Sequence, residues 1–216
     1  MEKKILSHAN LVDEARTFCT SSHLYPELYG VTDGKAVGTF MERRFQEQIQ
    51  ANYITEIGNA ALGLDLPAIE TDIKVTSIRQ PQSSCPFRSA RQKIYGLGYN
   101  LLVFVYEKED AQASQTAQLS FVSCAFIEKN RTADYLTTRG ILRILEHEGN
   151  RDDLFAFLSD RNLPGDEIVY YSLADEILQT PPQLGYLTIS NALQWRLQYG
   201  RIVQLQESVS GIVKIV

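Results

Sequence analysis

The sequence has few cysteines and no long run of apolar residues. Its three cysteines, Cys19, Cys85 and Cys124, are widely separated and show neither Cys-x-x-Cys nor cysteine–histidine spacing, which argues against a disulfide framework and structural zinc. No apolar stretch approaches the roughly 18–20 residues that are needed to cross a bilayer, and the first residues lack a signal-peptide core. We therefore expect a soluble, cytoplasmic protein that does not bind membranes.

A surplus of positive charge is also lacking. The formal net charge is −5, which counts against a nucleic-acid partner because phosphate neutralisation drives much of DNA affinity. The distribution of charge matters more than its sum. Residues 73–105 contain no acidic residue, whereas acidic residues gather in 107–110 and 146–153. A surface for DNA is therefore compatible with the sequence if it is built from the acid-free stretch.

Hydrophobic periodicity predicts an α/β protein in which a mixed β-sheet is flanked by helices. Apolar residues at helical spacing predict helices over residues 11–20, 34–57, 89–95, 132–147, 152–158, 173–178 and 189–199. Runs of β-branched and aromatic residues predict strands over residues 71–76, 100–106, 119–127, 168–171, 202–205 and 212–216. The chain is 44 per cent hydrophobic, which is enough for one sizeable core, so we expect a single domain over 1–216.

Charged side chains gather at the strand over 71–76. Asp65 precedes Asp72 by seven residues, and Lys74 follows two residues later. Alternate residues of a strand share a face, so Glu70, Asp72 and Lys74 point the same way, and Asp65 arrives from the preceding segment. Two carboxylates can hold Mg²⁺, and a lysine can orient or help deprotonate a water beside a phosphate. The alternative is a strand face that is simply exposed to solvent.

The predicted helix over 34–57 carries a further acid. Gly38 and Glu42 are four residues apart and therefore lie on nearly the same face of this helix. A glycine at that place lets another backbone or a ligand approach closely. The alternative to a functional role is that Gly38 is only a glycine near the start of a helix and that Glu42 is exposed to solvent.

These two patterns resemble the PD-(D/E)XK nuclease superfamily, in the branch that contains the MutH mismatch-repair endonuclease and related type II restriction enzymes. The first pattern is an acid, an apolar residue and a proline, followed by an acid, an apolar residue and a lysine. It is present here as Asp65-Leu-Pro and Asp72-Ile-Lys74. The second is a lysine, a glycine and a glutamate on the first core helix, present here as Lys35, Gly38 and Glu42.

The resemblance implies a restriction-endonuclease-like core at about 35–127, with DNA-recognition additions at about 128–216. It implies that Asp65, Asp72 and Glu42 ligate Mg²⁺ and that Lys74 is the catalytic lysine. The implied activity is that of a type II restriction endonuclease, which hydrolyses double-stranded DNA at a short specific site as a homodimer. The alternatives are a MutH-type strand-nicking repair endonuclease, and a non-catalytic DNA-binding protein whose Asp-x-Lys is only a strand face.

The polar stretch over 79–93 is the predicted DNA-binding region. Arginine can bond guanine and glutamine can bond adenine, so the stretch has the residue types that direct base readout needs. The same residue types suit contacts with phosphate, or a loop exposed to solvent. The candidate DNA-binding residues are Arg79, Gln82, Arg88, Arg91 and Lys93.

Overall fold

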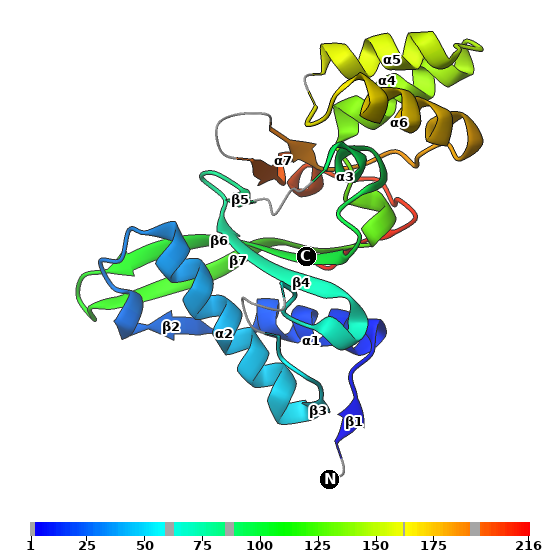
Figure 1. Cartoon of the computed structure of the whole chain (residues 1–216). Coiled ribbons are helices and arrows are strands. Elements are labelled where there is room, and N and C mark those ends of the chain that lie inside the picture. The colour runs from blue at the N-terminus through cyan, green and yellow to red at the C-terminus, as the bar shows by residue number, and fades with distance from the viewer. Residues whose placement is uncertain (1–2, 59–62, 85–88, 162, 191–194) are drawn as a thin grey trace. The chain divides into compact units, whose positions relative to one another are not determined.

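The chain folds into a mixed α/β structure whose internal contacts divide it into two compact units (Figure 1). The computed structural model describes residues 3–58, 63–84, 89–161, 163–190 and 195–216, so Cys85 and Arg88 lie outside the described residues. Unit 1 comprises Met1–Gln82, Asn100–Ile127 and Gln206–Val216, and unit 2 comprises Ser83–Tyr99 and Glu128–Leu205. The single domain over 1–216 stays a prediction.

Unit 1 is built on a five-stranded sheet. Its strands are β2 (His23–Tyr25), β4 (Thr71–Ser77), β6 (Asn100–Ala111), β7 (Thr116–Ile127) and β10 (Ile212–Lys214). The order is β10-β7-β6-β4, and β2 pairs with β7 as well. β4 runs parallel to β6, whereas β6 and β7 form a long antiparallel hairpin. The sheet is therefore mixed, which confirms the predicted fold class.

Two helices cover one face of this sheet, α1 (His8–Thr20) and α2 (Gly34–Asn52) (Figure 1). Their buried side chains share one hydrophobic cluster with the alternate β6 residues Leu102, Phe104 and Tyr106. At its centre the rings of Phe45 and Phe104 are 4.9 Å apart, and those of Phe18 and Phe45 are 5.1 Å apart. These aromatic contacts pack α2 against α1 and β6.

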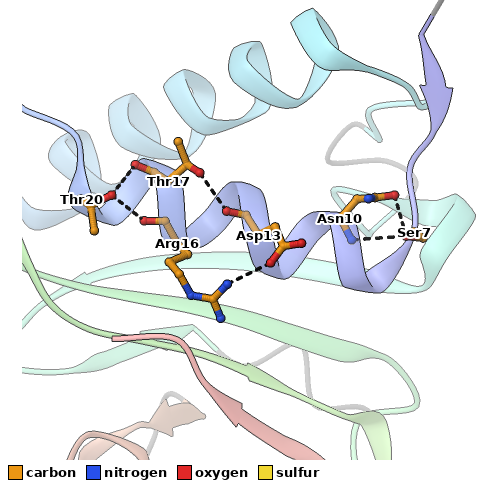
Figure 2. A network of polar contacts seen from close by, with 6 residues as sticks. All are labelled: Ser7, Asn10, Asp13, Arg16, Thr17 and Thr20. Carbon is orange, nitrogen blue, oxygen red and sulfur yellow. Dashed lines mark hydrogen bonds and ion pairs between the residues drawn. The ribbon is translucent and has the colours of Figure 1, made fainter.

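The outer face of α1 is polar (Figure 2). The helix begins after Ser7, whose hydroxyl accepts a hydrogen bond from the backbone N–H of Asn10. Further along, Asp13 and Arg16 form an exposed ion pair at 2.9 Å, and two threonine hydroxyls, of Thr17 and Thr20, donate to backbone carbonyls one turn earlier. Leu11, Ala15 and Phe18 are buried on the opposite side, so the helix is amphipathic and its apolar face meets the sheet.

The remaining elements of unit 1 are short. They are β1 (Lys4–Ile5), β3 (Tyr53–Ile54) and the 3-10 turns η1 (Pro26–Leu28) and η2 (Pro67–Ile69). β1 and β3 pair in parallel, so the chain leaves α2 at Asn52 and enters an extended pairing. The prediction that this helix continues to residue 57 was therefore wrong.

Unit 2 is mainly helical. Its helices are α3 (Ala90–Tyr95), α4 (Tyr135–Glu146), α5 (Arg151–Asp160), α6 (Glu167–Gln179) and α7 (Gly200–Val203), with the 3-10 turn η3 (Lys129–Arg131). A small three-stranded sheet has the order β5-β9-β8, from β5 (Gln82–Ser84), β8 (Thr188–Ile189) and β9 (Arg196–Gln198). Helices α3 to α6 contribute to a second hydrophobic cluster. No described helix is long and apolar enough to cross a membrane.

Three predictions for unit 2 were wrong. Residues 168–171 are not a strand but the first turns of α6, which begins after the N-cap Asp166 and buries Tyr170, Leu173, Ala174 and Ile177 at helical spacing. Residues 189–199 are not one helix, because Ile189 and Leu197 pair in β8 and β9, and residues 191–194 lie outside the described residues. The predicted strand over 202–205 overlaps the short helix α7.

Candidate active site

Asp72 and Lys74 form a close ion pair on β4. The Lys74 Nζ atom lies 2.7 Å from Asp72 Oδ2, with 7 per cent of the Asp72 side chain exposed and 23 per cent of that of Lys74. A strand face that is merely solvated does not bury a carboxylate in this way. Glu70 does not share this face, because it lies before the strand in a left-handed backbone conformation. The acid and the lysine are therefore a partly enclosed pair.

Asp65 is fixed beside this pair. One of its carboxylate oxygens, Oδ2, accepts a hydrogen bond from the backbone N–H of Ile73 at 2.8 Å. The other, Oδ1, accepts from Gln46 Nε2 at 3.2 Å. The carboxyl group of Asp65 also lies close enough to that of Asp72 to raise its pKa. The loop before β4 thus brings together the two acids that the sequence pattern paired.

Helix α2 supplies the fourth member of the site. A Cβ atom at Gly38 would lie only 2.8 Å from the carbonyl oxygen of Val75, so the glycine permits direct contact between α2 and β4. Glu42 lies one turn further along the same helix, and its carboxyl group lies close enough to Asp65 for that residue to raise its pKa. The expected role of Gly38 in a close backbone approach is confirmed. Lys35, in the first turn of α2, is exposed.

The electrostatics of the site favour an additional cation. Burial and the neighbouring Asp65 carboxylate raise the pKa of Glu42 to about 8. Burial and the neighbouring Asp65 carboxyl group raise the pKa of Asp72 to about 7, although Lys74 opposes the shift. One lysine therefore does not neutralise three clustered carboxyl groups, which favours binding of a further cation.

The donor set suits a hard divalent cation. Within the described part of the chain, no group of three His, Cys, Asp or Glu side chains already has the arrangement of a metal site. Magnesium, however, is usually held by one or two carboxylates together with waters and substrate phosphates. Asp65 and Asp72 could provide those carboxylates, and a bound cation would offset the repulsion between them. Glu42 would lie next to such an ion.

The predicted DNA-binding residues have different surroundings. Arg79 is exposed in the turn after β4, and the backbone of Gln82 is tied to the hydroxyl of Thr76 by two hydrogen bonds. In unit 2, Arg91 forms an ion pair with Glu176 at 2.7 Å.

Lys93 is buried, with its Nζ atom 5.7 Å from the centre of the Trp195 ring. Arg88 lies outside the described residues. A contact of Lys93 with DNA therefore requires its side chain to be uncovered, whereas Arg79 is already accessible.

Sequence reasoning missed Gln46, which holds Asp65 in place. Gln46 follows Glu42 by four residues on α2, so the helical spacing that identified Glu42 also places Gln46 on the same face. That spacing could have identified Gln46 from the sequence. The segment before β4 shows no comparable pattern that would have predicted the contact between Asp65 and α2.

The model of the type II restriction enzyme NspV family matches residues 5–214 of the chain, which includes every residue of the site. The chain belongs to the NspV family. The type II restriction enzyme NspV of Nostoc sp. (strain ATCC 29411 / PCC 7524) is 54% identical to it over 213 residues, 98% of this chain and 97% of the relative. No solved structure matches the chain. Membership of the NspV family confirms the predicted type II restriction enzyme, whereas the PD-(D/E)XK assignment stays a prediction.

Proposed function

We propose that this member of the NspV family is an Mg²⁺-dependent endodeoxyribonuclease of the PD-(D/E)XK type, which cuts both strands of double-stranded DNA at a short specific site. The observation that carries the proposal is the enclosed Asp72–Lys74 pair at 2.7 Å, backed by the carboxyl groups of Asp65 and Glu42. The name of the Nostoc relative, a type II restriction enzyme, supports the choice of substrate and reaction.

Each residue has a distinct task in this proposal. Asp65 and Asp72 hold the metal ion, which when bound supplies a Lewis acid and a more acidic water. Lys74 directs its ammonium group toward the attacking water and the phosphate that this water attacks. Glu42, next to the bound ion, would be ionised and would orient a water or a second ion. Hydrolysis leaves 5′-phosphate and 3′-hydroxyl ends.

Several further features belong to the same proposal. Arg79, Gln82, Arg88, Arg91 and Lys93 are proposed to contact DNA, and of those that are described Arg79 and Arg91 are exposed. Unit 1 holds the catalytic residues, and unit 2 would add recognition contacts. A homodimer would match the two-fold symmetry of a palindromic site and would place one active site on each strand. A cytoplasmic location would give the enzyme access to DNA.

The direct test is to incubate the purified protein with supercoiled plasmid DNA and Mg²⁺. The proposal predicts linear DNA, and a fixed set of fragments from phage DNA, without any added protein. Nicked circles as the only product would instead indicate a strand-nicking enzyme of the MutH type. Binding without any cleavage would indicate a non-catalytic DNA-binding protein.

A further inference from the structure

Two tyrosines of unit 2, Tyr135 and Tyr186, are held side by side by hydrogen bonds between backbone segments. The N–H of Tyr135 donates to the carbonyl of Leu187 at 2.8 Å, and the N–H of Tyr186 donates to the carbonyl of Arg131 at 3.0 Å. These bonds fix the start of α4 against the segment that leads to β8. The two tyrosine rings then meet edge to face, with their centres 6.4 Å apart.

Arginines from three separate segments lie against these rings. The guanidinium carbon of Arg201, in α7, is 3.5 Å from the centre of the Tyr135 ring, which is stacking distance. Arg139, one turn along α4, lies 5.8 Å from the same ring and donates from Nη1 to the Tyr135 hydroxyl at 3.4 Å. Arg131, in η3, lies 6.0 Å from the Tyr186 ring. We call Tyr135, Arg139 and Arg201 the Tyr135 cluster.

Among the described residues, no carboxylate forms an ion pair with the arginines of the Tyr135 cluster. In the described part of the chain no ion pair involves Arg139 or Arg201. Asp134 precedes Tyr135, but its two carboxylate oxygens accept hydrogen bonds from Ile189 and from the backbone and hydroxyl of Thr137. The Nε atom of Arg201 is buried and has no hydrogen-bond partner. A buried donor without an acceptor is costly, so this arrangement needs an explanation.

Two other arginines of unit 2 show what a purely structural stack looks like. Arg151 lies 4.5 Å from the centre of the Tyr171 ring and forms an ion pair with Asp175 at 2.7 Å. Arg91 lies 4.7 Å from the Tyr95 ring and pairs with Glu176. In both cases a carboxylate of the protein neutralises the stacked guanidinium. The Tyr135 cluster has the same stacking without a carboxylate partner in the part of the chain that the structure describes, which leaves its arginines available for an external anion.

We propose that Arg139 and Arg201, held by Tyr135, bind phosphate groups of the DNA backbone. A planar guanidinium matches two phosphate oxygens at once, and stacking on a ring reduces the freedom that it loses on binding. Such contacts position the protein on DNA without reading its sequence. The inference rests on the proposed function, and adds to the predicted region over 79–93 a phosphate-binding site carried wholly by unit 2.

The test compares Arg139→Gln and Arg201→Gln with the matched control Arg151→Gln, which removes a stacked arginine that has its own carboxylate. Binding of a fluorescent duplex of random sequence is measured in Ca²⁺ over a series of salt concentrations. Each arginine of the cluster that binds a phosphate should contribute about 0.9 to the slope of log affinity against log salt. We expect each single variant to bind several-fold more weakly with a slope lower by about that amount, and the control to bind like the wild type.

A structural role would not change the salt slope, and Arg139 provides the safer variant because its side chain is exposed on α4. Arg139→Lys should keep most of the slope, because the charge is retained. Wild-type slopes in both Gln variants, from an enzyme that still cuts DNA, would overturn this inference and leave the proposed function intact. A wild-type protein that neither binds nor cuts duplex DNA would overturn both.

Discussion

Gly38 and Val75 are in direct contact, because a Cβ atom at Gly38 would lie 2.8 Å from the Val75 carbonyl oxygen. The backbone of Val75 belongs to the strand that carries Asp72 and Lys74, and Gly38 belongs to the helix that carries Glu42. This contact sets the distance between the two elements of the site. A side chain at position 38 should therefore affect both stability and activity.

We predict that Gly38→Ala lowers the free energy of unfolding by about 1–3 kcal/mol, since the added methyl group must push α2 away from β4. DNA cleavage should fall as Glu42 moves away from Asp65. The matched control is Gly34→Ala in the same helix, where the nearest atom to a new Cβ is the Tyr106 hydroxyl at 3.9 Å. Urea unfolding and cleavage rates measure the two effects, and equal stability of both variants would contradict the prediction.

A second prediction concerns Asp134, whose carboxylate joins two parts of unit 2. It caps α4 through Thr137 and also accepts the backbone N–H of Ile189 at the end of β8. Asp134→Ala should cost about 2–5 kcal/mol, because it leaves buried donors without acceptors. Asp134→Asn keeps one acceptor oxygen and should be less destabilising. Thermal unfolding that is unchanged in Asp134→Ala would show that these bonds contribute little.

The third prediction is a dependence of stability on pH in the metal-free protein. The folded protein holds Asp72 with a pKa of about 7 and Glu42 with a pKa of about 8, whereas the ordinary values are 3.8 and 4.5. Between about pH 4 and about pH 8 the folded state therefore binds more protons than the unfolded chain. The free energy of unfolding accordingly falls as the pH rises through this range. Chemical unfolding in a chelator across this range measures the slope.

Two comparisons make the pH prediction specific. Asp72→Asn does not titrate at that position, so its stability should depend less on pH than that of the wild type. Added Ca²⁺ should restore more stability at the alkaline end of the range, where the carboxyl groups are already ionised. A metal-free protein whose stability rises through this range would contradict the assigned pKa shifts.

The sequence predicted the parts of the site that depend on local spacing. The seven-residue spacing from Asp65 to Asp72, and the four-residue spacing from Gly38 to Glu42, indicated a strand and a helix that bring acids together. The hydrogen bonds from Ile73 and Gln46 to Asp65 join residues from three segments, so spacing within a single segment does not predict them. The burial of Asp72 is likewise a property of the assembled unit.

Unit 2 was harder to predict because short runs are ambiguous. The run of isoleucine, valine and two tyrosines over 168–171 suits a strand by composition, but the N-cap Asp166 and the buried residues further along extend a helix through it. The pairing of Ile189 with Leu197 joins strands of two and three residues, too short to show a period. Tertiary contacts therefore decided these elements.

The fourth prediction concerns the identity of the metal ion. Replacing Mg²⁺ with Ca²⁺ should preserve DNA binding but suppress hydrolysis, because the larger ion fills an oxygen site without holding water in tight octahedral geometry. Binding and cleavage of the same duplex, measured in each metal and in a chelator, separate the two steps. Undiminished cutting in the chelator would exclude the metal-dependent mechanism.

The central claim is that Asp72 and Lys74 act on DNA as a catalytic pair, and the most direct measurement is the cleavage rate of Lys74→Ala in Mg²⁺. The matched control is Lys108→Ala, which breaks another ion pair between alternate residues of a strand, Lys108 and Asp110 of β6. We predict that Lys74→Ala still folds and binds DNA but no longer cuts it, whereas Lys108→Ala cuts at the wild-type rate. Near-normal cutting by Lys74→Ala would contradict the proposed active site.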